Sequence, residues 1–148
     1  MKNCLILLSL FLCLAAAGCN TTGTPVEHAK ACDAENDGKT LEVSGFLSDK
    51  GSLFCSNTGG GPVRCGFKLL AAPTDDKGFS ADIETGSGAN TVEKPTSSYK
   101  KEDLKVRDNS GSVINLAEKV KVTGKIRTTK DPASNNVVCY MSVYKIEK

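Results

Sequence analysis

The stretch Glu118-Lys119-Val120-Lys121-Val122-Thr123-Gly124-Lys125-Ile126 decides the fold class of this chain. In an extended conformation, Val120, Val122 and Ile126 fall on one side. The polar residues of the other side are Lys119, Lys121, Thr123, Lys125 and Arg127. Strict alternation of this kind predicts a β-strand with one face on a core and the other in water.

The same period of two recurs along the chain. Residues 40–48 place Leu41, Val43 and Leu47 on one face. Further short runs with strand character lie at residues 52–56, 63–71, 79–83 and 137–148. Residues 104–107 and 113–114 flank Asp108-Asn109-Ser110-Gly111, which is a strong hairpin turn signal. Many short strands separated by turns predict a small all-β barrel or sandwich.

Two segments depart from the strand pattern. Residues 25–34 predict a short N-terminal helix, with Pro25 at its start and Asn36-Asp37-Gly38 as the stop. Residues 85–101 are rich in Gly, Ser and Thr and predict a long connection.

Three stretches resemble parts of an OB-fold. Residues 118–126 resemble its fourth strand and residues 41–47 its first, while residues 104–111 resemble the strand and turn that often lie between them. The order along the chain is correct, and the whole is similar to uncharacterised bacterial envelope proteins with paired cysteines. The resemblance implies a small OB-like β-barrel and no activity. A long inserted loop at roughly residues 72–98 departs from the minimal OB barrel. A different β-barrel is the alternative.

The N-terminus has the pattern of an export signal. Met1-Lys2-Asn3 is a short basic start, and residues 5–14 are almost all apolar. This run is shorter than the roughly 20 residues that span a bilayer. Leu14-Ala15-Ala16-Ala17-Gly18-Cys19 resembles the lipobox of bacterial lipoproteins, although Ala16 stands where that family usually has Leu. The resemblance implies that Cys19 is lipidated and becomes the first residue of the mature chain.

This interpretation divides the chain into a signal peptide (residues 1–18), the lipidated Cys19 with a stalk (19–30) and an OB-like barrel domain (31–148). It places the protein in the cell envelope, facing outside the cytoplasm on the outer membrane or on the periplasmic face of the inner membrane. Asn20 is not the Asp that marks inner-membrane retention in that family. The alternative is an ordinary cleavage after Ala15-x-Ala17, which would give a soluble secreted protein that starts at Gly18.

Four cysteines remain once Cys4 and Cys13 leave with the signal and Cys19 takes the lipid. An even number in an oxidising compartment predicts two disulfides, for which three pairings exist. Cys55–Cys65 is favoured because the two residues flank a Gly-rich loop. Cys32–Cys139 would then tie the start of the domain to its last strand.

No metal or cofactor is expected. The cysteines lack C-x-x-C spacing, and His28 is the only histidine, which argues against zinc and against a redox thiol pair. Residues 33–38 resemble the start of an EF-hand calcium loop. However, Leu41 and Ser44 occupy positions nine and twelve, where the loop needs oxygen ligands and a bidentate Glu.

The charge pattern offers one candidate contact surface. The chain carries a formal net charge of only +2, which makes no electrostatic case for a nucleic-acid partner. A basic stripe on one strand face could contact an anion, lipid headgroups or an acidic partner, and its alternative is a solvated strand face. The stripe consists of Lys119, Lys121, Lys125 and Arg127. Phe54 and Phe67 are expected to fill the core.

The sequence lacks a recognisable set of catalytic residues, so an enzyme is disfavoured. A catalytic Ser–His pair would have to use His28, which lies near the expected stalk. The four thiols are expected to form disulfides and so could not act as nucleophiles. The acids at Asp75, Asp76, Asp82 and Glu84 are scattered through polar stretches, with no sign of burial or pairing.

The sequence therefore predicts a membrane-anchored binding module for a protein or a small ligand. Its contacts would come from the loops, chiefly the loop between Cys55 and Cys65 and the segment 85–98. The alternative is an inhibitor of an envelope or host hydrolase, similar to lysozyme-inhibitor lipoproteins, with the bridged loop as a rigid probe.

Overall fold

The structure, a computed structural model, describes residues 21–49, 53–57, 60–96, 98–131 and 136–148. The expected signal peptide and Cys19 lie outside the described residues. The strands are β1 (Thr24–Pro25), β2 (Thr40–Ser48), β3 (Phe54–Ser56), β4 (Arg64–Leu70), β5 (Gly78–Glu84), β6 (Val106–Arg107), β7 (Val113–Ile114), β8 (Lys119–Lys130) and β9 (Val137–Glu147). Short 3-10 helices are η1 (His28–Lys30), η2 (Ala34–Asn36) and η4 (Lys101–Asp103). The predicted all-β class is confirmed.

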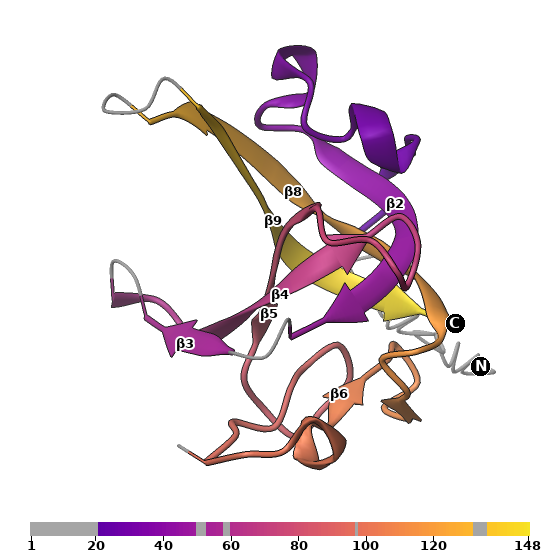
Figure 1. Cartoon of the computed structure of the whole chain (residues 1–148), viewed down its shortest axis with the longest axis vertical. Coiled ribbons are helices and arrows are strands. Elements are labelled where there is room, and N and C mark those ends of the chain that lie inside the picture. The colour runs from indigo at the N-terminus through magenta and orange to yellow at the C-terminus, as the bar shows by residue number, and fades with distance from the viewer. Residues whose placement is uncertain (1–20, 50–52, 58–59, 97, 132–135) are drawn as a thin grey trace, which may run out of the picture.

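Five strands close into a barrel (Figure 1). The order around the barrel is β2-β8-β9-β5-β4, and β4 pairs with β2 again to complete the circle. Neighbours are antiparallel except β5 and β9, which run parallel. The result is the predicted small OB-like barrel, in which β2 is the first barrel strand and β8 is the fourth.

Apolar side chains that point inward at alternate positions of each strand fill the barrel. Val43, Phe67, Ile83, Val122 and Met141 come from five different strands, and all five are fully buried. Their neighbours in sequence point outward, as the period of two requires, except Thr123, which is buried at the register shift of β8. This inward set excludes water from the barrel and stabilises it, because burial of apolar side chains is the dominant favourable term in folding.

At Gly124 the strands β8 and β9 approach each other closely. A Cβ atom at this position would lie 2.4 Å from the carbonyl oxygen of Ser142 on β9. The register of β8 against β9 shifts between Thr123 and Gly124, so the strand pair bends there. Only a residue without a side chain fits at this bend.

Each end of the barrel has its own cover (Figure 1). The η1–η2 segment closes one end and buries Ala31 completely. The β6–β7 hairpin and the chain around it close the other end, where Val92, Val106 and Ile114 join the core.

The insertion predicted at residues 72–98 is partly wrong. Its first half contains β5, which pairs with β4 and β9, and only the part after Glu84 is extra to the barrel.

The short helix predicted over residues 25–34 is not an α-helix. Thr24 and Pro25 instead pair in parallel with Leu41 and Glu42 of β2, and Val26 N–H donates to the Glu42 carbonyl at 3.0 Å. Only single 3-10 turns follow. The segment cannot coil into an α-helix because its start is held extended on a strand. The expected stalk over residues 19–30 is correspondingly shorter, since the chain already packs on the barrel at β1.

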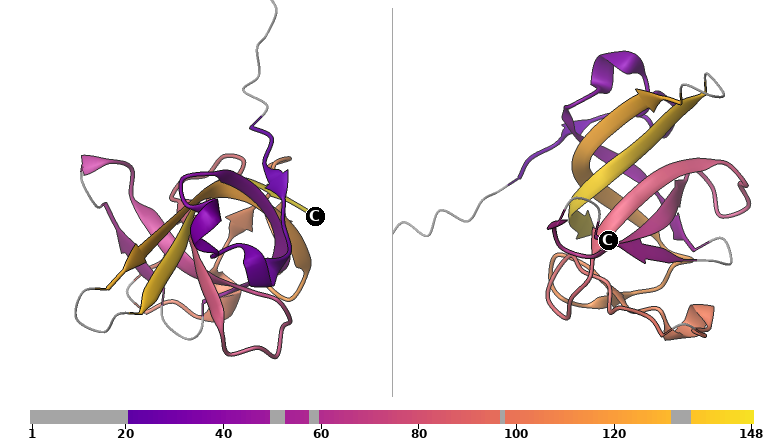
Figure 2. Two further views of the ribbon diagram at one scale, coloured as in Figure 1. Left: turned by 90° about the horizontal axis from the view of Figure 1, so that it is seen from above. Right: turned by 90° about the vertical axis from the view of Figure 1, so that its left-hand side faces the viewer.

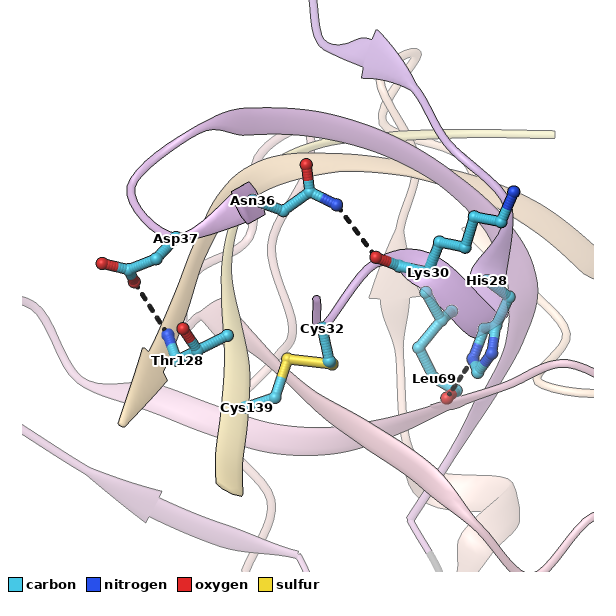
Figure 3. Close-up of a disulfide and its surroundings, with 8 residues drawn as sticks. All are labelled: His28, Lys30, Cys32, Asn36, Asp37, Leu69, Thr128 and Cys139. Carbon is cyan, nitrogen blue, oxygen red and sulfur yellow. Dashed lines mark hydrogen bonds between the residues drawn. A yellow bond between two sulfur atoms is a disulfide. The ribbon is translucent and has the colours of Figure 1, made fainter. Parts of the chain in front are cut away.

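The disulfide Cys32–Cys139 fastens the η1–η2 cover to β9, across a separation of 107 residues (Figure 3). The ring Nε2 of His28 lies 2.9 Å from the Leu69 carbonyl oxygen, and Asn36 Nδ2 donates to the Lys30 carbonyl. Together these contacts hold the cover on the barrel end.

The stretch that resembles a calcium loop serves the same cover. Asp37 Oδ1 accepts a hydrogen bond from Thr128 N–H of β8 at 2.9 Å (Figure 3). Within the described ranges, no group of three or more His, Cys, Asp or Glu side chains is placed to hold a metal ion.

We predict that the two disulfides contribute unequally to stability. Replacing both Cys32 and Cys139 by Ser should lower the free energy of unfolding by about 4–5 kcal/mol. The same change at Cys55 and Cys65, which are only 10 residues apart, should lower it by about 2–3 kcal/mol. The longer closed loop restricts the unfolded chain more. Urea unfolding of both double variants measures the difference, and a larger loss from the Cys55–Cys65 pair would contradict it.

Candidate functional site

A cleft of about 650 Å³ lies on the outer side of the barrel. Four strands that are consecutive in the sheet, β3, β4, β5 and β9, supply its floor and walls. Its lining residues are Phe54, Ser56, Gly61, Pro62, Arg64, Gly66, Ser80, Asp82, Tyr140 and Ser142. The volume falls in the range of small-molecule sites in proteins. The position also matches the face and loops with which OB-folds bind oligonucleotides and oligosaccharides.

Phe54 stands on one wall of the cleft and is 76% exposed. The prediction that it fills the core is therefore wrong, whereas Phe67 is fully buried as predicted. The reason is the position of β3, which pairs with β4 alone and lies at the edge of the sheet. An exposed phenylalanine beside a cavity offers an apolar surface to a ligand.

The disulfide Cys55–Cys65 fixes this wall, and it joins residues that face each other directly on β3 and β4. The predicted pairing of all four cysteines is confirmed. The opposite wall is Tyr140 on β9, which follows Cys139, the residue bonded to Cys32. Each wall of the cleft thus lies next to a disulfide in sequence, so both walls are held before a ligand arrives.

The floor of the cleft is open because Gly66 has no side chain. Gly66 takes an outward position on β4 between Arg64 and Lys68 and faces Asp82 on β5. A Cβ atom there would lie 3.4 Å from Asp82 Oδ1 and from Ser80 Oγ, at the base of the cleft. A glycine within a strand commonly marks the close approach of another group, so Gly66 is the sequence signal that could have revealed the floor and that sequence reasoning missed.

Asp82 is the acidic residue among those that line the cleft. Its carboxylate accepts a hydrogen bond from Ser80 Oγ at 2.9 Å. Burial raises the pKa of the Asp82 carboxyl above its ordinary value, against the lowering effects of that hydrogen bond and of the Arg64 charge. The expectation that the acids show no burial or pairing is therefore wrong for Asp82. It is also wrong for Glu84, whose carboxylate lies 3.6 Å from Arg64 Nη2.

Charges on the floor nearly cancel. Arg64 lies between Asp82 and Glu84, and Lys68 sits opposite Ser80 on the same side of the sheet. Arg64 Nη1 is buried and has no hydrogen-bond partner among the described residues. The floor therefore offers hydrogen-bond donors and acceptors without a strong field of either sign.

The predicted basic stripe lies elsewhere, on the outer face of β8. Its residues alternate with buried neighbours as expected, although Thr123 in its middle is itself fully buried. Lys121 Nζ lies 3.5 Å from a carboxylate oxygen of Glu42 and 3.7 Å from one of Glu147. Arg127 lies further along the strand, near Gly38. Neither this stripe nor His28 contributes to the cleft lining.

Of the two loops expected to bind a ligand, one lines the cleft and the other does not. The loop between Cys55 and Cys65 supplies Gly61 and Pro62 to the cleft. The segment 85–98 does not line it, because Asn90 is bound to the end of β9. Asn90 Oδ1 accepts from Ile146 N–H at 2.8 Å, in a backbone conformation with φ of 59°. That segment is part of the barrel's end cover.

Comparison with protein-family models, with curated protein sequences and with solved structures finds no match. Two disulfides place the domain in an oxidising, non-cytoplasmic compartment. In the part of the chain that the structure describes, no helix has the length and apolar content needed to cross a bilayer.

We predict that Asp82→Asn removes a pH-dependent cost to folding. A carboxyl with a raised pKa in the folded state binds protons more tightly there than in the unfolded chain. Stability is therefore lost as the pH rises from the ordinary Asp value through the raised one. The variant should gain stability relative to the wild type at pH 7 and show a smaller gain at pH 3. Urea unfolding at both pH values measures this, and equal differences would contradict it.

Proposed function

We propose that this protein is an envelope-anchored binding module whose cleft takes a short, neutral saccharide. The observation that supports this proposal is the cleft, which has the exposed Phe54 on one wall and Tyr140 on the other. Gly66, Ser80 and Asp82 form its floor. The C–H groups of a sugar ring form a flat apolar face that packs on aromatic rings. Its hydroxyl groups need donors and acceptors placed side by side, which the floor provides.

The charge of the cleft supports a neutral ligand over a polyanion. Proteins that bind nucleic acid neutralise phosphates with clustered Lys and Arg. In this cleft the Arg64 side chain already lies between two carboxylates, those of Asp82 and Glu84. The function therefore includes no nucleic-acid partner.

Anchoring by lipid is the second part of the proposal. It is supported by the resemblance of residues 14–19 to a lipobox and by the two disulfides, which require a non-cytoplasmic compartment. Several acyl chains on Cys19 would hold the domain on the membrane permanently, whereas a single chain would not. The protein would then present its cleft to envelope saccharides, without transforming them.

We predict that two cleft variants lose saccharide binding for different reasons. Phe54→Ala removes an apolar wall and should weaken binding at least tenfold, equivalent to about 1.4 kcal/mol. Gly66→Val fills the floor and should abolish binding. The β-branched valine suits a strand, so the variant should keep its fold. The probe is the N-acetylglucosamine tetramer, measured by isothermal titration calorimetry. Tyr144→Ala is the matched control, because Tyr144 is also an exposed aromatic residue and does not line the cleft.

Three results would overturn this function. One is an affinity of the wild type for oligothymidylate equal to or above that for the tetramer. Another is equal loss in the Tyr144 variant. The third is recovery of shortened sugars after incubation with the wild type, which would make the protein a glycoside hydrolase.

A second candidate function is inhibition of an envelope or host hydrolase, favoured by the projection of Phe54 from a disulfide-bonded edge strand. A rigid exposed aromatic residue can fill an enzyme's active site at little entropic cost. In this case, the domain should inhibit a lysozyme-type hydrolase at equimolar concentration, and Phe54→Ala should relieve the inhibition at least tenfold. Absence of inhibition at a large excess of the domain would exclude this candidate.

A further inference from the structure

The first described residues of the chain are held firmly on the barrel. Gly23 lies so close to β2 that a Cβ atom on it would come within 2.5 Å of the Leu41 backbone. Thr24 and Pro25 continue along β2 as β1, and Val26 donates to the Glu42 carbonyl. The barrel therefore begins, in effect, at Gly23.

This docking leaves little chain between barrel and anchor. If Cys19 is lipidated, as the proposed function has it, only residues 20–22 separate it from Gly23. A fully extended chain advances at most about 3.6 Å per residue, so the two Cα atoms can be at most about 14 Å apart. The barrel then cannot leave the membrane surface, and the side that carries β1 must stay near the bilayer.

The side of the barrel that carries β1 has a positive charge, which suits contact with anionic lipid headgroups. We define the tether face as the outer surface of β2, of β8 from Lys119 to Lys125 and of the end of β9. Its charged residues are Glu42, Lys119, Lys121, Lys125, Lys145 and Glu147. Lys145 Nζ lies 3.0 Å from Glu147, and Lys121 bridges Glu147 and Glu42. Within the described residues, Lys119 and Lys125 have no carboxylate partner, so four lysines and two glutamates leave the face positive.

The cleft lies on the other side of the molecule. The closed strand order β2-β8-β9-β5-β4 puts β5, which carries Ser80 and Asp82 of the cleft floor, across the barrel from β2 and β8, with β4 and β9 on either side of it. Figure 2 (left) shows the indigo β1 segment on one side of the barrel and β3, with the end of β8 and the start of β9, on another.

We propose that the tether face rests on the anionic headgroups of the membrane and that the cleft opens away from the bilayer. The proposal rests on the lipid anchor of the proposed function. The short tether supplies the proximity, and attraction between the unpaired lysines and anionic lipids selects the face. A ligand would then approach from the aqueous side.

Energy transfer from tryptophan tests this orientation, because the chain contains no tryptophan of its own. Ser44→Trp places the donor on β2 beside the tether face, and Phe54→Trp places it at the cleft. Each full-length, lipidated variant is reconstituted into vesicles of phosphatidylcholine with 30% phosphatidylglycerol and a trace of dansyl-labelled headgroups. Transfer from Trp at position 44 should exceed that from position 54 at least threefold.

Two control variants separate the causes. A 20-residue Gly-Ser spacer inserted after Thr22 should remove most of the difference, since the barrel is no longer held near the bilayer. The double change Lys119→Glu and Lys125→Glu should reduce transfer from position 44 at least twofold on anionic vesicles and leave it unchanged on neutral ones.

Mass spectrometry of the reconstituted protein decides which claim fails. If the chain is acylated at Cys19 and the two donors transfer equally, or position 54 transfers more, the orientation is wrong and the anchor stands. If the chain is not acylated, the anchor is wrong and this inference falls with it.

Discussion

Three residue pairs join β5 to β9 in parallel, and together with the β2–β4 pairing this seam closes the barrel on which the rest of the structure depends. Ser80, Ala81 and Asp82 lie parallel to Tyr140, Met141 and Ser142. The middle pair, Ala81 and Met141, points inward and is fully buried, so it completes the core. The outer pairs point the other way and form the floor and one wall of the cleft. Closure of the fold and formation of the candidate site are therefore one event, because successive residues of a strand face opposite sides.

The disulfides extend this constraint to parts that the seam does not reach. β3 pairs with a single neighbour, and an edge strand of three residues has few contacts of its own. Its bond to β4 through Cys55–Cys65 holds Phe54 in position without a second strand. Cys32–Cys139 does the same for the start of β9 and also fastens the end cover. A site with walls fixed in this way loses little conformational entropy when a ligand binds.

The sequence predicted most of the barrel and little of the site. Long alternating runs such as residues 118–126 and 41–47 predict both the strands and their buried faces, because one face meets the core and the other meets water. The same rule failed for Phe54, since a three-residue strand is too short to show a period. It also missed Asp82, whose burial depends on β4 and β9 lying beside it, a consequence of pairing between distant parts of the chain. The docking of β1 on β2 was missed for the same reason.

Mapping of amide chemical shifts tests the central claim most directly, namely that the outer side of the closing seam is the ligand site. Isotope-labelled mature protein with Cys19→Ser would be titrated with the N-acetylglucosamine tetramer. We expect the largest shifts at Ser80, Asp82 and Ser142 of the seam and at Gly66, which lies beside it on β4. Shifts confined to the basic face of β8 or to the β6–β7 cover, or no shifts at millimolar sugar, would contradict it.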